Sequence, residues 1–219
     1  MATTKIKVRT PVFRGSYAKI ATPQTTQDGR TCYEITGVFD IEGDDWRKDP
    51  KFAELRKAFK STAMEKHGKV IGVRNPFRIG IEDDTMGAEP YDEETLEKNP
   101  FYRGKLIIPF RSYGMQPDCA KLVGGKPQRV EDLTEMYSGA YFIATVTPFA
   151  YGGKKGKDGQ PIKRGVSFGL ASLLFVRDGE PLGAVSDAMR DFEDFDASDP
   201  KYGIDNSDLL GDDDDDYDL

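Results

Sequence analysis

Histidine and cysteine are scarce in this sequence, and their scarcity excludes several kinds of site. Only His67, Cys32 and Cys119 occur among 219 residues. A zinc site or a Ser–His–Asp triad would depend on that single imidazole, which we expect at the surface near a helix end. The two cysteines fit no metal-binding or redox spacing, so we expect free thiols.

Long apolar segments are also missing. No run of about 18 apolar residues occurs, so no membrane span is expected. The N-terminus, MATTKIKVRTPVF, has no apolar signal core, which predicts a cytoplasmic protein. Neither a Walker sequence nor a G-x-G-x-x-G motif after a strand is present. These absences leave no recognisable nucleotide-binding or catalytic motif.

Positively charged residues are nearly absent from the end of the sequence. Residues 187–219 hold 14 Asp/Glu and 2 Lys/Arg, a net charge of −12, and residues 1–186 hold 24 acids and 29 bases, a net charge of +5. A second acidic segment, residues 82–97, has eight acids and no base. We therefore expect a basic domain, residues 1–186, that carries an acidic insert at 82–97. The tail, residues 187–219, has too few apolar residues to offset the ordering of its backbone, which predicts disorder.

Short segments of alternating polarity predict that the domain is mainly β. The expected strands are residues 5–13, 31–41, 104–112, 121–130, 139–153 and 163–179. Gly37 interrupts the second of them and predicts a β-bulge. The Gly-Gly pair at 124–125 predicts a β-hairpin turn, and the Gly- and Lys-rich segment 153–162 predicts a loop between the last two strands.

The segment 104–113 is expected to have one core face and one open face. The expected core residues are Leu106, Ile108 and Phe110. The expected open face comprises Lys105, Ile107, Pro109, Arg111 and Tyr113.

One helix is expected after the second strand. Asp49 is a possible N-cap, Pro50 suits the first turn, and Gly68 is a natural stop. Its apolar face would comprise Phe52, Leu55, Phe59 and Met64. A shorter helix is expected after Pro90. The order of these elements predicts an OB-fold-like Greek-key barrel with one main helix, a β-hairpin extension and a disordered acidic C-terminal tail.

Aromatic and basic side chains alternate along several of these segments. Rings on which bases stack, next to cations that follow the phosphates, are typical of proteins that bind single-stranded nucleic acid. The candidate residues are Arg14, Tyr17, Trp46, Arg47, Phe77, Arg78, Lys105, Arg111, Tyr113, Phe149, Tyr151, Lys154, Lys155, Lys157, Lys163 and Arg164. The alternative for each of these aromatic residues is that its ring is buried in the core of the barrel.

Two other functions fit parts of the sequence. A carboxylate–metal nuclease would use the acidic residues, but a run of aspartates does not hold carboxylates in a converging geometry. A polyanionic interaction protein, such as a chaperone or a mimic of nucleic acid, would explain the tail but not the basic strands. We expect no catalytic residue, no metal and no cofactor.

Four sequence features, in this order along residues 30–219, resemble a known family. They are YEITGVFDI followed by KDPKFAELRKAFK, then GKLIIPFRSYG with KLVGGKPQ, then GAYFIATVTPFAYGG, and then VSFGLASLLFV before the acidic tail. The chain is similar to the replicative OB-fold single-stranded DNA-binding proteins of T-odd and related enterobacterial tailed phages.

The resemblance implies binding of single-stranded DNA without sequence preference, in replication and recombination in the host bacterial cytoplasm. It also implies an acidic tail that recruits a polymerase, a helicase-primase or a nuclease, and a homodimer as in some relatives. The tail residues concerned are Asp212, Asp213, Asp214, Asp215, Asp216, Tyr217, Asp218 and Leu219. Relatives usually end in Phe, whereas this chain ends in Leu219, which departs from the family's pattern.

Overall fold

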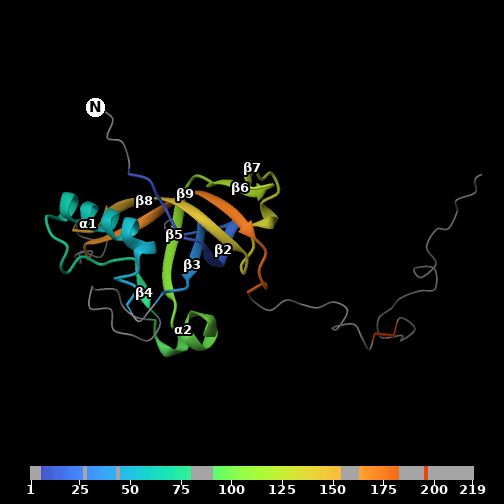
Figure 1. The fold of residues 1–219 in the computed structure, drawn as a ribbon, viewed down its shortest axis with the longest axis horizontal. Helices are drawn as coiled ribbons and strands as arrows, with labels where there is room; N and C mark the ends of the chain where they lie inside the picture. The colour runs from blue at the N-terminus through green and yellow to red at the C-terminus, as the bar shows by residue number, and fades with distance from the viewer. Residues whose placement is uncertain are drawn as a thin grey trace, which may run out of the picture. The chain divides into compact units, whose positions relative to one another are not determined.

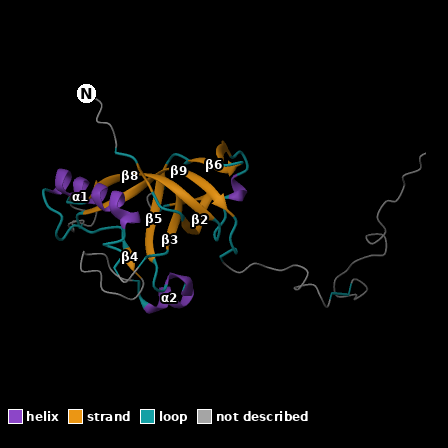
Figure 2. Cartoon of the chain, viewed as in Figure 1, coloured by secondary structure: helices purple, strands orange, loops and turns teal. Residues whose placement is uncertain are grey.

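The computed structural model describes residues 6–26, 29–42, 45–79, 91–153, 163–182 and 195–196. The chain divides into two units, residues 1–183 and 184–219. All the described helices and strands lie in the first unit (Figure 1), and strands predominate (Figure 2). The prediction of a mainly β protein with one main helix is confirmed. The predicted disorder of the tail concerns residues outside the described part, apart from 195–196. None of the described helices is long and apolar enough to cross a membrane.

Five strands close into a barrel. They are β2 (Phe13–Thr25), β3 (Thr31–Phe39), β5 (Leu106–Tyr113), β8 (Tyr141–Tyr151) and β9 (Gly165–Arg177). They are hydrogen-bonded in the order β2–β3–β5–β9–β8, and β8 returns to pair with β2. β5 and β9 are parallel, and the other neighbours are antiparallel. This is the five-stranded Greek-key barrel of the OB fold that the sequence predicted.

The other strands extend this barrel. β1 (Val8–Arg9) pairs with β8, and β4 (Arg78–Ile79) pairs with β5. β6 (Asp118–Val123) and β7 (Lys126–Arg129) form the predicted hairpin, and β6 pairs with β9. The turn needs positive φ at two successive residues, and Gly124 (φ 57°) and Gly125 (φ 78°) supply it.

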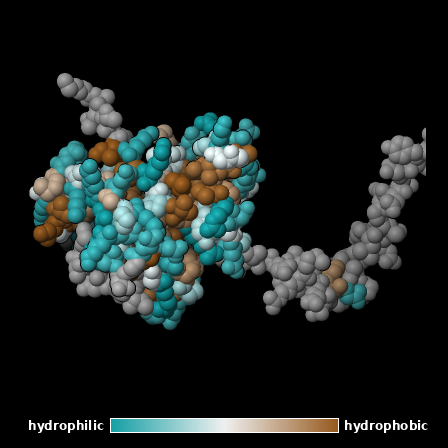
Figure 3. Space-filling model, in the orientation of Figure 1, coloured by the Kyte–Doolittle hydropathy of each residue, from teal (hydrophilic) through white to brown (hydrophobic). Residues whose placement is uncertain are grey.

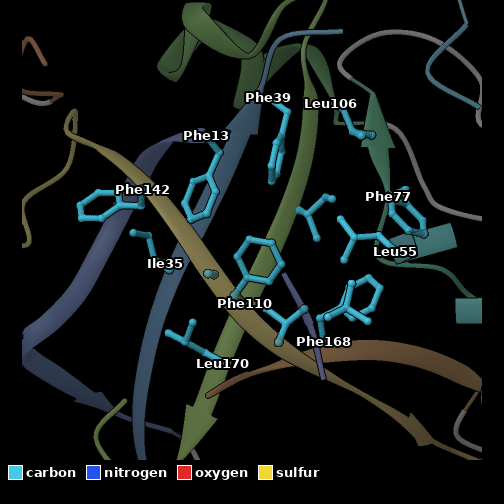
Figure 4. Close-up of a cluster of buried hydrophobic side chains, with 14 of the residues drawn as sticks. Phe13, Ile35, Phe39, Leu55, Phe77, Leu106, Phe110, Phe142, Phe168 and Leu170 are labelled. Carbon is cyan, nitrogen blue, oxygen red and sulfur yellow. The ribbon is translucent and has the colours of Figure 1, made fainter. Parts of the chain in front are cut away.

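Aromatic side chains fill the barrel, as Figure 4 shows. The ring of Phe13 lies 5.2 Å from that of Phe39 and 5.6 Å from that of Phe110, measured between centroids. The predicted bulge at Gly37 is wrong, because β3 pairs with β5 in unbroken register. A Cβ at Gly37 would lie 2.7 Å from the Phe39 ring and 2.9 Å from the Phe110 ring. Glycine is needed there for close packing of the core.

The main helix is α1 (Ala53–His67), which follows the short 3₁₀ turn η1 (Pro50–Phe52). Asp49 caps η1 by accepting a hydrogen bond from the Lys51 N–H at 2.9 Å. Gly68 ends α1 in the left-handed conformation (φ 69°), as predicted. The helix buries Leu55 and Phe59 and packs on β1, β8 and β9. Met64, expected on the apolar face, is 53% exposed because the buried stripe passes through Thr62 and Ala63 instead.

A smaller hydrophobic cluster covers one end of the β3–β5 surface. It involves α2 (Glu93–Lys98), the expected helix after Pro90, and η2 (Pro100–Tyr102). Leu96 and Tyr102 pack on Val38 and Ile107. Ile107, predicted on an open face, is therefore fully buried.

A third 3₁₀ turn, η3 (Leu133–Glu135), precedes β8. On the side of the molecule shown in Figure 3, hydrophilic residues surround a hydrophobic area over β8 and β9.

Candidate nucleic-acid interface

A cleft of about 1090 Å³ lies where β5, β8 and β9 meet the C-terminal end of α1. β5 contributes residues 111–113, β8 with the glycines after it contributes 147–153, and β9 contributes 169–171. Arg111 pairs with Gly169, which in turn pairs with Thr147, so the three strands form a continuous floor. The cleft thus combines segments that are far apart in the sequence.

The cleft includes part of the surface at which OB folds bind oligonucleotides, namely the end of β5 and the two ends of the β8–β9 connection. In that fold the second and third barrel strands, with the loops between the first and second and between the fourth and fifth, form the binding surface. Here those strands are β3 and β5, and the fourth–fifth connection is the segment between β8 and β9. Gly152, Gly153 and Arg164, at the two ends of this segment, line the cleft.

Two aromatic rings on β8 form one wall of the cleft. Phe149 is 39% exposed, and its ring centroid lies 6.5 Å from that of Tyr151. Both rings lie over glycines of β9. A Cβ at Gly165 would lie 2.3 Å from Tyr151 Cζ, and one at Gly169 would lie 3.7 Å from Phe149 Cδ1. The glycines therefore give the rings room to lie across the strand pair with a face toward the cleft.

The opposite wall is aromatic and charged. Tyr113 on β5 is 41% exposed, and the Arg30 guanidinium carbon lies 4.7 Å from its ring centroid. Arg111 Nε donates a hydrogen bond to Glu34 Oε2 at 2.7 Å. Burial lowers the pKa of Arg111, but its pairing with Glu34 outweighs this effect and raises the pKa above its ordinary value. Arg111 is thus a fixed positive charge in the cleft.

The C-terminal end of α1 adds polar residues that the sequence analysis did not assign to the site. Lys66 and His67 line the cleft, and His67 Nε2 lies 3.1 Å from the Gly165 carbonyl oxygen. The Arg74 N–H donates to the Arg164 carbonyl oxygen at 2.9 Å, which attaches the segment after the helix to β9. The basic residues of α1 are visible in the sequence, but nothing in it shows that this helix end packs beside β9.

Two of the predicted stacking residues belong to the core. Trp46 is 0% exposed and Phe77 is 1% exposed, and their rings stack with centroids 4.8 Å apart. A base cannot reach either ring, so their prediction as binding residues is wrong. The charges around Trp46 indicated exposure, but Arg47 and Lys48 pair with Asp45 while the indole turns inward.

Five other predicted residues do not line the cleft. Arg14 donates to the Glu180 carbonyl oxygen at 2.6 Å, and Lys105 pairs with Asp40. Arg78 lies over the Tyr91 ring. Arg47, as described, is paired with an aspartate. Tyr17 is 50% exposed, and its hydroxyl donates to Asn99 Oδ1 at 3.0 Å.

The remaining predicted residues divide between the cleft and the part that is not described. Tyr113, Phe149, Tyr151, Arg111 and Arg164 line the cleft, and Lys163 is exposed beside Arg164. Lys154, Lys155 and Lys157, and the tail residues 212–219, lie outside the described residues. Within the described part of the chain, no group of three or more His, Cys, Asp or Glu side chains could hold a metal ion.

Comparison with two solved structures of the bacteriophage Enc34 protein supports the assignment of the fold. The single-stranded DNA-binding protein of bacteriophage Enc34 in complex with ssDNA matches with a TM-score of 0.56 and 19% identity, over 81% of this chain and 89% of that one. A second structure of the single-stranded DNA-binding protein from bacteriophage Enc34 matches with a TM-score of 0.54 and 18% identity, over 85% and 89% of the two chains. The single-stranded DNA-binding protein gp2.5 of bacteriophage T7 matches with a TM-score of 0.48 and 15% identity, over 86% and 94%.

Sequence comparison identifies the family. No significant match was found among curated protein sequences. The family model described as Enterobacter phage Enc34, ssDNA-binding protein, matches residues 4–202, which is most of the chain. This chain therefore belongs to the Enterobacter phage Enc34 ssDNA-binding protein family.

Proposed function

We propose that the protein binds single-stranded DNA without sequence preference, with the strand lying in the cleft between β5, β8 and the end of α1. The observation that carries this proposal is the gathering of three partly exposed rings, Tyr113, Phe149 and Tyr151, in one cleft with Arg111 and Arg164. The setting is the protection of phage DNA during replication and recombination in the host bacterial cytoplasm.

The chemistry of the cleft suits a single strand better than a duplex. Unpaired bases expose their faces, which stack on aromatic rings with about 1–3 kcal/mol per base. In a duplex those faces are already stacked on one another, so the rings would gain little. Arg111 and Arg164 would neutralise phosphates, which makes the affinity fall as salt rises. None of these contacts reads a base edge, so little sequence preference is expected.

A comparison of DNA forms tests the proposal. Fluorescence anisotropy would measure the dissociation constants for labelled oligo-dT and for a duplex of equal length at the same salt concentration. We expect much tighter binding of oligo-dT, with little change when its sequence is replaced by another unstructured one. Equal affinity for the duplex, or no binding of either, would contradict the proposal.

We also propose that the acidic tail has two roles. Residues 187–219, with a net charge of −12, would compete with DNA for residues 1–186, with a net charge of +5. When DNA displaces the tail, the tail would recruit a replication partner such as a polymerase, a helicase-primase or a nuclease. Charge would steer this encounter, and Tyr217 and Leu219 would supply an apolar contact.

Two variants separate these roles. Removal of residues 187–219 should tighten binding of oligo-dT at low salt and lose this effect at higher salt, because screening weakens the competition. Replacement of Tyr217 and Leu219 by Ala should leave DNA affinity unchanged and weaken partner binding. A truncated protein with wild-type affinity at low salt would exclude the competition.

A further inference from the structure

A second hollow lies beside the cleft on the outer surface of the barrel. It measures about 520 Å³ and is bordered by Lys7, Arg9, Glu54, Thr145 and Ser172, which come from the β1 segment, α1, β8 and β9. Lys7 and Arg9 are both exposed, whereas Val8 between them is 7% exposed. Because side chains alternate along an extended chain, both cations point to the same side.

The hollow continues the cleft along three segments at once. Ile6 lines the cleft and Lys7 lines the hollow. On β9, Ala171 lines the cleft and Ser172 lines the hollow. On β8, Thr147 lines the cleft and Thr145 lines the hollow. Two residues along a strand span only about 7 Å. A DNA strand that leaves the cleft at Thr147 would therefore enter the hollow at Thr145.

The hollow is bordered by two cations, Lys7 and Arg9, and by one carboxylate, that of Glu54. Among the residues that the structure describes, neither Lys7 nor Arg9 forms an ion pair, whereas Lys105 is paired with Asp40. Thr145 and Ser172 add hydroxyl groups. Lys, Arg, Ser and Thr side chains are the usual contacts to nucleic-acid phosphates. Among the described residues that border this hollow none is aromatic, so they offer no surface for stacking.

We infer that the hollow is a phosphate subsite that extends the DNA path beyond the cleft, with Lys7 and Arg9 as its cations. This inference rests on the proposed binding of single-stranded DNA. It divides the surface into two parts with different chemistry. The cleft holds bases on its rings, and the hollow holds the sugar–phosphate backbone of the nucleotides that follow.

The length of the oligonucleotide provides the test. The variant Lys7→Gln/Arg9→Gln would be compared with wild type on a series of oligo-dT from about 4 to about 20 nucleotides, within and beyond the usual site size of one OB fold. We expect unchanged affinity for the shortest oligonucleotides that bind, which fill the cleft alone, and weaker binding of the longer ones. For the long oligonucleotides the slope of log K against log salt should become shallower by about 1.4, at about 0.7 for each cation removed.

Two further variants serve as controls. Lys126→Gln/Arg129→Gln removes the same charge from β7, which borders neither the cleft nor the hollow, and should behave as wild type at every length. Because Arg129 is paired with Asp118, this variant controls for total charge and not for the loss of an unpaired cation. Lys7→Arg/Arg9→Lys keeps both charges and should keep the wild-type slope.

Three outcomes would overturn the inference. One is wild-type binding by Lys7→Gln/Arg9→Gln at all lengths, and another is an equal loss at all lengths. The third is the same loss in the β7 variant, which would indicate a general charge effect. Failure of the wild-type protein to bind any oligo-dT would instead refute the proposed function, and the inference with it.

Discussion

The substitution Phe149→Ala separates binding from stability. The Phe149 ring is 39% exposed and lies over Gly169 at the cleft, outside the barrel core. Its removal should cost the stacking of one base, about 1–3 kcal/mol. Since about 1.4 kcal/mol corresponds to a tenfold change, the dissociation constant for oligo-dT should rise by about 5- to 150-fold. The melting temperature should remain near that of wild type, because substitutions of exposed residues seldom change stability much.

The assay for this prediction is an anisotropy titration with labelled oligo-dT at one fixed salt concentration, together with a thermal melt of each variant. Tyr17→Ala is the matched control, because the Tyr17 ring is 50% exposed but lies outside the cleft. The control should bind as wild type. The reasoning would be refuted if folded Phe149→Ala bound as tightly as wild type, or if Tyr17→Ala lost as much affinity.

Three further predictions concern the floor of the cleft, the core and one thiol. Gly169→Leu should weaken oligo-dT binding, because the larger side chain would fill the cleft floor or displace Phe149. Gly169→Ala should be tolerated, because the nearest atoms to its Cβ, Thr147 O and Phe149 Cδ1, lie 3.5 and 3.7 Å away. Equal titration curves for the two variants would contradict this prediction. Trp46→Ala should lower the free energy of unfolding by about 3–5 kcal/mol. Trp46→Phe should lower it less, because the buried indole N–H has no hydrogen-bond partner among the described residues; denaturant titrations measure both. Burial, with a smaller effect of Asp118, raises the pKa of Cys119 from 9.0 to about 11. The unfolded state therefore releases this proton first, and the free energy of unfolding should fall as pH rises from about 9 to about 11; Cys119→Ala should remove that part of the slope.

The barrel could be predicted because local signals agreed with the final fold. Alternating strands, the Gly124–Gly125 turn and the α1 stop at Gly68 all depend on neighbours in the sequence. The sequence predicts a bulge at Gly37 because glycine is typical both of bulges and of a close approach of side chains, here the rings of Phe39 and Phe110. Only the positions of Phe39 and Phe110 in the fold distinguish these two causes.

The candidate site was only partly predictable for a related reason. Phe149 and Tyr151 are separated by one residue on a strand, so their common face follows from the period of two. The burial of Trp46 depends on Phe77, which is distant in sequence, and local charge gave the opposite indication. The positions of the end of α1 in the cleft and of Lys7 at the hollow likewise follow from tertiary packing.

The most direct test of the central claim is a crystal structure of the protein with oligo-dT. The account predicts bases stacked on Tyr113, Phe149 and Tyr151, with phosphates near Arg111 and Arg164. An oligonucleotide bound instead beside α2 or on the β6–β7 hairpin, with the three rings unoccupied, would contradict it.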